Sequence, residues 1–307
     1  MLLWIVIFVI SLGVLIKGTD WFLEGAEEMG KRLGFSPFIV GVLIVGLGTS
    51  FPELTSSLFA LYQGASDVAV ANAVGSNIAN ILLVGGLLAF VGKNVKTTKT
   101  LLRADIPFLV IATLVLLAVA YNGDVVFSEA VVLVLMYGFY LIHTIVYSPT
   151  VEHVPISRST KKDTALKISV GLLGLLIGAK FFIDSVIAMS VLLGLSTGVL
   201  ALVFVALGTS LPELIVSIRA AQSSRGEIAL GNIFGSNIFN ALVVVGIPAL
   251  FASLTVDIQT LHTGLSFMLI ATTLFVVSSI SNRFKKADGL MYILVYAYFL
   301  LQLSGLV

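Results

Sequence analysis

Long apolar stretches separated by short polar turns run along nearly the whole chain. A helix needs about 20 predominantly apolar residues to cross the hydrocarbon core of a membrane. Stretches of about this length lie at residues 2–23, 37–62, 68–91, 104–121, 126–147, 166–190, 197–221, 227–252, 261–281 and 289–306. The pattern predicts an all-α membrane protein with ten transmembrane helices.

Composition agrees with a membrane protein and excludes several kinds of chemistry. Hydrophobic residues make up 58% of the chain and charged residues only 11%, whereas soluble domains carry about 25% charged residues. The chain has no cysteine, which excludes disulfides, thiolate metal sites and thiol redox chemistry. No basic residue precedes the first apolar stretch, because Lys17 lies beyond its start, so we do not expect a cleaved signal peptide.

The basic residues predict how the chain is oriented. Lysine and arginine favour the cytoplasmic side of short loops. All 17 basic residues except Lys17 and Lys180 fall in or at the edge of the loops that follow the odd-numbered apolar stretches. We therefore expect a multi-pass protein of the cell membrane with both termini outside and the odd-numbered loops in the cytoplasm.

Two motifs occur twice, each time 160 positions apart. The first, Gly-Thr-Ser-x-Pro-Glu, spans residues 48–53 and 208–213. The second, Asn-x-x-Gly-Ser-Asn, spans residues 72–77 and 232–237. Each half of the chain holds five predicted crossings, so the second half must enter the membrane from the opposite face. We expect a first repeat over residues 1–147, a polar cytoplasmic linker over 148–165 and an inverted second repeat over 166–307, the organisation of many secondary transporters.

The repeated motifs place Glu53 and Glu213 inside apolar segments. Ionisable residues at membrane depth are expensive and mark ion pathways. Pro52 has no N–H for the Gly48 carbonyl, so we expect the helix to loosen just before it and to free carbonyl oxygens near residues 46–49. Thr49 lies one turn before Glu53 on the same face. Pro212 does the same in the second copy.

A second set of oxygen-bearing side chains follows in the next helix of each half. Asn72, Ser76 and Asn80 recur at four-residue spacing, as do Asn232, Ser236 and Asn240. Ca²⁺ takes 6–8 oxygen ligands, and neither histidine nor cysteine lies near these motifs, which argues against zinc, copper or iron. The two glutamates supply a charge of −2, which one Ca²⁺ neutralises, so the exchanged partner must be another cation, Na⁺ or H⁺.

In these motifs the chain resembles the sodium/calcium exchanger family of the cation/Ca²⁺ antiporter superfamily, in its prokaryotic type without a regulatory domain. The resemblance covers essentially the whole chain. It implies a ten-helix antiporter that exchanges Na⁺ for Ca²⁺ by alternating access, with about three Na⁺ per Ca²⁺. It also implies that helices 2, 3, 7 and 8 form the core and that helices 1 and 6 slide across it.

The resemblance also implies a set of metal ligands. Glu53 and Glu213 would be the central ligands shared by Ca²⁺ and Na⁺. The remaining ligands would be the side chains of Thr49, Thr209, Ser50, Ser210, Ser76, Ser236, Asn80 and Asn240 and the carbonyls of Gly46 and Ala206. Many relatives have an aspartate where this chain has Asn240, and K⁺-dependent members use it for K⁺. We therefore expect exchange that does not require K⁺.

Three rival functions have distinct signatures. A H⁺/Ca²⁺ antiporter would use the same two glutamates but follow a pH gradient. A passive channel would carry current without a counter-ion. An intramembrane hydrolase would need a nucleophile with a base or paired aspartates, and no such pair is placed for it, so we do not expect an enzyme. We expect Ca²⁺, Na⁺ and the lipid bilayer as partners, with no cofactor, nucleic acid or protein partner.

Overall fold

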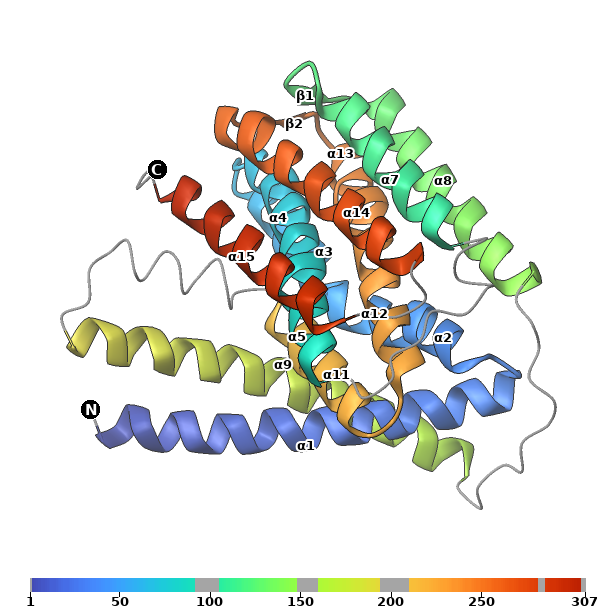
Figure 1. Ribbon diagram of the computed structural model, residues 1–307, viewed down its shortest axis with the longest axis vertical. Coiled ribbons are helices and arrows are strands. Elements are labelled where there is room, and N and C mark those ends of the chain that lie inside the picture. Colours follow the sequence, from blue (N-terminus) through green and yellow to red (C-terminus); the bar gives the residue numbers. More distant parts are fainter. Residues whose placement is uncertain (1, 92–104, 148–159, 194–209, 281–284, 305–307) are drawn as a thin grey trace.

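The computed structural model describes residues 2–91, 105–147, 160–193, 210–280 and 285–304, and these ranges are almost entirely helical (Figure 1). In the first half of the chain the elements are α1 (Leu2–Leu33), α2 (Pro37–Val40), the π-helical segment η1 (Gly41–Gly46), α3 (Leu47–Tyr62), α4 (Asp67–Ile78), the π-helical segment η2 (Ala79–Val84), α5 (Gly85–Val91), α7 (Asp105–Ala120), the short strand β1 (Asp124–Val125) and α8 (Phe127–Tyr147).

The second half follows with the same kinds of element. They are α9 (Lys161–Leu192), α11 (Leu211–Gln222), α12 (Gly226–Phe239), the π-helical segment η3 (Asn240–Val244), α13 (Gly246–Ala249), the short strand β2 (Leu254–Thr255), the π-helical segment η4 (Thr260–Gly264), α14 (Leu265–Ile280) and α15 (Lys286–Leu303). Residues 197–209 of the expected seventh crossing lie outside the described residues, and α11 accounts for the rest of it.

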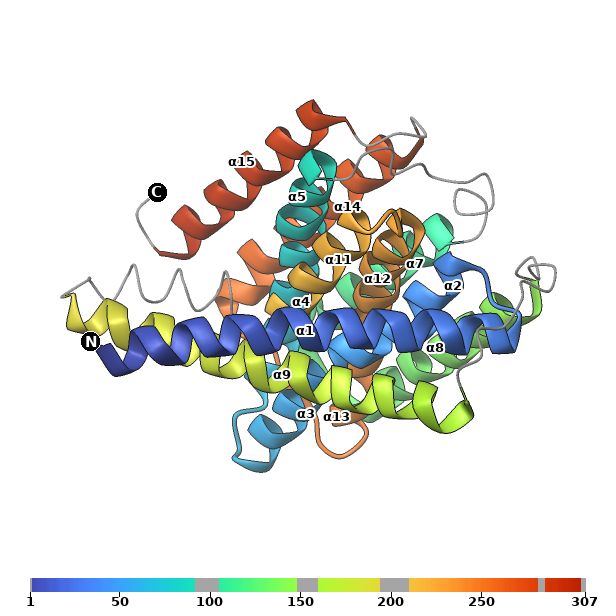
Figure 2. The same cartoon turned by 90° about the horizontal axis from the view of Figure 1, so that it is seen from below.

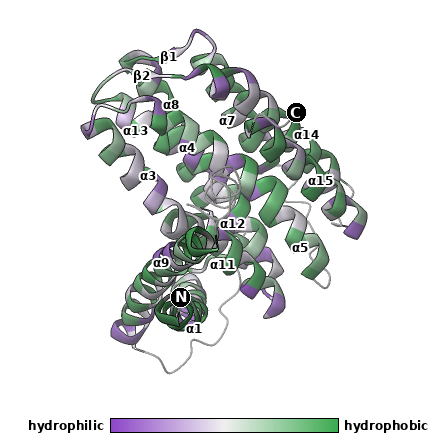
Figure 3. Cartoon of the chain, turned by 90° about the vertical axis from the view of Figure 1, so that its left-hand side faces the viewer, coloured by the Kyte–Doolittle hydropathy of each residue, from purple (hydrophilic) through white to green (hydrophobic). Residues whose placement is uncertain are grey.

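Seven of the described helical spans are long and apolar enough to cross a membrane, and α7 is a shorter apolar helix. Hydrophobic residues line most of the ribbon in Figure 3, with hydrophilic residues at several turns and helix ends. Together with the composition, these spans make the chain an integral membrane protein.

The helices α1 and α9 form an antiparallel pair that crosses beneath the other helices (Figures 1 and 2). Glycines let their backbones meet: a Cβ on Gly18 would collide with the backbone of α9 at Gly171 and Leu175, and one on Gly178 would collide with Leu15. Small residues that allow such close approach are the usual means by which transmembrane helices associate. The rest of this pair is largely exposed, since only 22% and 28% of the two apolar windows are buried.

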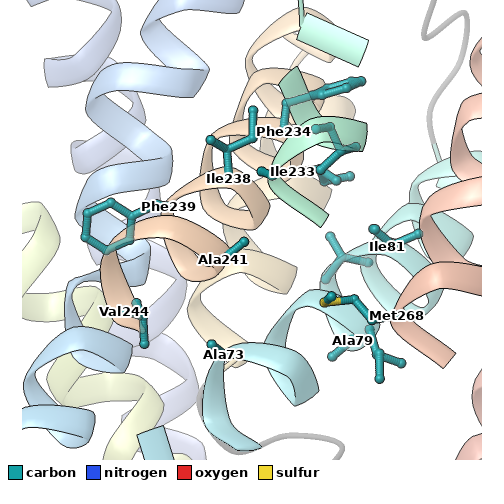
Figure 4. Close-up of a cluster of buried hydrophobic side chains, with 14 of the residues drawn as sticks. Ala73, Ala79, Ile81, Ile233, Phe234, Ile238, Phe239, Ala241, Val244 and Met268 are labelled. Carbon is teal, nitrogen blue, oxygen red and sulfur yellow. The ribbon is translucent and has the colours of Figure 1, made fainter. Parts of the chain in front are cut away.

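The helix α12 lies at the centre of the molecule, and its apolar window is buried along its whole length. Phe234, Ile233 and Ile238 pack in a cluster with Ile81 of η2 and Met268 of α14 (Figure 4). A helix that is buried on every side has no solvent or lipid face. The polar residues of α12 therefore lie inside the protein.

Two expected boundaries were wrong, and both helices are longer than predicted. The first extends to Leu33 rather than residue 23 because its polar end is held by ion pairs, including Glu27–Lys31 within the helix and Glu28–Lys167 to α9. The sixth begins at Lys161 rather than 166, within the expected linker, because Thr160 and Asp163 form a capping box. Lys31 and Arg32 are thus part of the last turn of α1 and not of a loop.

Turns that follow even-numbered apolar stretches meet at one end of the molecule. The strands β1 and β2 pair with each other, and Ser66, in the turn between α3 and α4, hydrogen bonds to Thr255 of β2 with 2.9 Å between the hydroxyl oxygens. Ends that border odd-numbered loops meet separately: Glu27 of α1 pairs with Arg225, before α12, at 2.8 Å.

Candidate functional site

Each half has a π-helical interruption directly after the helix that carries the second repeated motif. The π-helical segments η2 and η3 begin at Ala79 and Asn240, so that Asn80 and Asn240 both lie at the start of a π segment. Inserted π turns frequently accompany functional sites. The loosening expected before Pro52 lies further upstream than predicted: η1 ends at Gly46, and Pro52 lies inside the α-helix α3.

The two glutamates lie on helices from opposite halves of the chain, and both are buried. The exposed fraction is 0% for Glu53 on α3 and 1% for Glu213 on α11. Ser50 of α3 donates a hydrogen bond of 3.1 Å to Oε1 of Glu213. The Glu213 carboxylate therefore reaches the helix that carries Glu53, and neither glutamate points into lipid.

Further hydrogen bonds tie α12 to the first-half segment that contains Gly46 and Thr49. The Thr49 hydroxyl donates to Oδ1 of Asn232 at 3.2 Å, and the Ser236 hydroxyl donates to the Gly46 carbonyl at 3.4 Å. Glycines permit this contact, because a Cβ on Gly231 or Gly235 would strike the backbone of α2 or η1. Oxygen atoms of both halves thus meet at one interface.

An asparagine in each half fixes the glutamate-bearing helix by the same bonds. Asn72 donates to the Glu53 carbonyl at 3.1 Å and to Ser57 Oγ at 3.1 Å. Asn232 donates to the Glu213 carbonyl at 3.4 Å and to Ser217 Oγ at 2.9 Å. The partners are matched by the 160-residue offset, so the sequence repeat is also a repeat of contacts.

The amides of Asn80 and Asn240 are fully buried, and the segment that carries each one packs against the glutamate-bearing helix of the other half, η2 against α11 and η3 against α3. Among the described residues no hydrogen-bond partner is found for the oxygen or nitrogen of either amide, nor for Oε2 of Glu213. Buried polar atoms without partners are costly. These oxygens are therefore suited to bind an ion.

Most of the predicted ligands are buried inside the protein. The side chains of Glu53, Glu213, Thr49, Ser50, Ser210, Ser76, Ser236, Asn80 and Asn240 are all buried, as is Gly46. Hydrogen bonds connect Ser50 with Glu213 and Ser236 with Gly46. Thr209 and Ala206 lie outside the described residues.

The donor set agrees with a hard cation. Within the described ranges, no group of three or more His, Cys, Asp or Glu side chains gathers in a way that could hold a metal ion. A cation bound between the two glutamates would take its other ligands from hydroxyl, amide and carbonyl oxygens, which suit Ca²⁺ better than a transition metal.

Two features of this region were missed from the sequence. Arg219 was expected at the edge of the loop after the seventh stretch, and Asp20 was given no transport role. In the structure Arg219 lies in α11 and binds Asp20 of α1 through both carboxylate oxygens, with Nη2–O distances of 2.6 and 2.7 Å. The sequence signal for this pair was an arginine at the end of an apolar stretch, where a partner of opposite charge is expected. Asn232 appeared only as one member of a polar stripe, and its contact with Thr49 was not foreseen.

Comparisons with known proteins agree with this geometry. The family model described as sodium/calcium exchanger protein matches residues 3–146 and 165–304. The chain is 30% identical to the sodium/calcium exchanger MaX1 of Methanosarcina acetivorans, over 97% of both chains. Its structure is similar to that of the sodium-calcium exchanger NCX_Mj soaked with zero Na⁺ and Ca²⁺, with a TM-score of 0.85 and 28% identity over 98% of this chain and 99% of the other.

A structure of NCX_Mj soaked with Na⁺ and Sr²⁺ is similar as well, with a TM-score of 0.83, 29% identity and 97% of each chain covered. The two matched ranges of the family model leave out most of the polar linker and little else. They fall on either side of it, as the two sequence repeats do. The chain belongs to the sodium/calcium exchanger family, a family of ion antiporters and not of enzymes.

Proposed function

We propose that this protein is a secondary active antiporter that exchanges Na⁺ for Ca²⁺ by alternating access. The observation that carries the proposal is the pair of buried glutamates on α3 and α11, joined through the bond from Ser50 to Glu213. Membership of the exchanger family supports the choice of ions. Two buried carboxylates without a cation repel each other, so the change from one side of the membrane to the other is favoured only when the site holds a cation.

We assign the central ligand role to Glu53 and Glu213. The hydroxyls of Thr49, Ser50, Ser210, Ser76 and Ser236, the amides of Asn80 and Asn240 and the Gly46 carbonyl complete the set, together with Thr209 and Ala206. Supporting this assignment, the described members are buried, and Ser50, Thr49 and Ser236 form hydrogen bonds between the two halves. Their oxygens provide the 6–8 donors that Ca²⁺ takes.

Ten crossings arranged as two inverted repeats are the topology that best accounts for the contacts. Turns after even-numbered stretches meet through Ser66, β1 and β2, whereas ends beside odd-numbered loops meet through Glu27 and Arg225. Such a division is expected if the two groups lie on opposite faces of the membrane. The basic residues of the second group put it in the cytoplasm, which leaves both termini outside.

Charge counting favours an electrogenic cycle. Two glutamates neutralise one Ca²⁺, whereas three Na⁺ would leave the site with a charge of +1. Transport would then respond to membrane potential, which acts at about 2.3 kcal/mol per charge and 100 mV. Asn240 adds no charge, so we propose that K⁺ is not needed.

Uptake of ⁴⁵Ca²⁺ into proteoliposomes, with Na⁺, H⁺ and K⁺ gradients varied independently, tests the proposal. Uptake should follow an outward Na⁺ gradient and remain unchanged without K⁺. It should increase when the vesicle interior is made positive, because three Na⁺ leaving for one Ca²⁺ entering carry one net positive charge out. Uptake that follows a pH gradient without Na⁺ would favour the H⁺/Ca²⁺ alternative. A strong K⁺ requirement would contradict the role given to Asn240.

A further inference from the structure

Asn232 lies between the two glutamate-bearing helices but is not one of the proposed ligands. Its side chain is fully buried on α12. The amide nitrogen donates to Ser217 Oγ at 2.9 Å and to the Glu213 carbonyl at 3.4 Å, both on α11. The amide oxygen accepts from the Thr49 hydroxyl of α3 at 3.2 Å. One side chain therefore connects α11 with α3.

The chemistry of these partners determines which way the amide faces. A main-chain carbonyl can only accept a hydrogen bond, so the Glu213 carbonyl requires the NH₂ group of Asn232 on the α11 side. The amide oxygen then faces Thr49. An amide oxygen also only accepts, so the Thr49 hydroxyl must be the donor. The hydroxyl has one proton, and its other acceptors, the Gly46 carbonyl at 3.4 Å and the Glu213 carboxylate, both belong to the proposed ligands. The bond to Asn232 therefore competes with bonds that would point the proton into the site.

A hydroxyl binds a cation through its oxygen lone pairs, and its proton must point elsewhere. We infer that Asn232 is a positioning residue that draws the Thr49 proton away from the transported cation and leaves the Thr49 oxygen free to bind it. The same amide holds the backbone of Glu213 in place. This inference rests on the proposed function, in which Thr49 and Glu213 bind the cation.

The first half contains a matching anchor, which argues against an accidental contact. Asn72 bonds to the Glu53 carbonyl and to Ser57 as Asn232 bonds to the Glu213 carbonyl and to Ser217. The part of the second half that corresponds to Thr49 is Thr209, outside the described residues. Asn232 is therefore the position at which the inference can be tested.

A double-mutant cycle isolates the effect of Asn232 on Thr49. The variants are Asn232→Leu, which has a similar shape and no polar group, Thr49→Val, which has no hydroxyl, and Thr49→Ser, which keeps it. The dissociation constant for Ca²⁺ is measured by calorimetry on the purified protein in detergent without Na⁺, and melting temperatures are recorded for each variant. Asn232→Leu should weaken Ca²⁺ binding about threefold to tenfold, the range expected for one net hydrogen bond.

The background decides the outcome. With Thr49→Ser the full effect of Asn232→Leu should remain. With Thr49→Val it should be clearly smaller, because no hydroxyl is left to orient and only the loss of the bond to the Glu213 carbonyl remains. Equal effects in both backgrounds, or unchanged Ca²⁺ binding with only a lower melting temperature, would overturn the inference. If Asn232→Leu does not fold, Ser217→Ala, which removes one anchor of the same amide, is measured in the three backgrounds with the same expectation at smaller size.

Binding and transport measurements separate this inference from the proposed function. A wild-type protein that binds Ca²⁺ and gives the expected cycle, but shows no Na⁺-driven uptake, would overturn only the antiport proposal. Normal uptake with an additive cycle would overturn only the role of Asn232. A wild-type protein that binds no Ca²⁺ would overturn both.

Discussion

Replacing Glu213 by glutamine removes one charge of the proposed site while keeping the shape of the side chain. Glu213 is 1% exposed, and its Oε1 accepts a bond from Ser50. A glutamine oxygen can accept the same bond, so the contact between α3 and α11 should persist. The perturbation is therefore electrostatic rather than steric.

The expected magnitude follows from the charge count. In the proposed site Glu53 and Glu213 together balance a divalent cation, and the variant would leave one positive charge of that cation without a counter-charge. Removing one partner of a buried charge pair costs about 3–5 kcal/mol. At about 1.36 kcal/mol for each tenfold change, Ca²⁺ binding should weaken by roughly two to four orders of magnitude.

Calorimetric Ca²⁺ binding and ⁴⁵Ca²⁺ uptake in proteoliposomes measure the effect, and Glu53→Gln should behave in the same way. Asp67→Asn provides a matched control, because Asp67 is an exposed carboxylate in the first turn of α4. It should leave Ca²⁺ affinity and uptake unchanged. Ca²⁺ affinity within threefold of the wild type in either glutamine variant would refute the assignment of the two carboxylates as central ligands.

Other expectations concern contacts around the site. Asp20→Asn weakens the bidentate pair with Arg219. Because both side chains are about a third exposed, we expect the free energy of unfolding to fall by only about 1 kcal/mol, which lowers the melting temperature by a few degrees. An unchanged melting temperature would show that the pair adds nothing to stability. Gly171→Val would place a side chain against the backbone of Phe22 and should destabilise the protein by about 1–3 kcal/mol. Gly138→Val has no atom within 4 Å of the added Cβ and should melt like the wild type. Equal melting temperatures for the two variants would contradict the packing of α1 on α9. Omitting K⁺ should leave wild-type Ca²⁺ uptake unaltered.

Much of the architecture was predictable because it follows from apolar length and from repeated motifs. The burial of Glu53 and Glu213 is confirmed, since a carboxylate in an apolar segment has to face the protein interior. Of the Ser, Thr and Asn positions of the two motifs that the structure describes, all are buried except Asn72, which is half-buried. Spacing alone was sufficient here, because residues four apart share a face of a helix.

What the sequence did not reveal depends on partners distant in the chain. The polar end of α1 continues as helix because Glu28 meets Lys167, 139 positions later, and hydropathy does not report such pairs. The bond between Thr49 and Asn232 spans 183 positions and arises only when α12 packs against η1. The helix interruptions were also misplaced: a proline indicates a missing donor, but the π segment η1 ends upstream, at Gly46.

The glycine-lined contact between α1 and α9 has a mechanical consequence. The backbones of the two helices touch at Gly18, Gly171 and Gly178. Little side-chain volume lies between them, so the two helices should move together as one rigid unit. Displacing that unit relative to the remaining helices would strain the salt bridges from Asp20 to Arg219 and from Glu27 to Arg225. Those two bridges lie seven positions apart on α1, so a displacement of the pair would act on both at once.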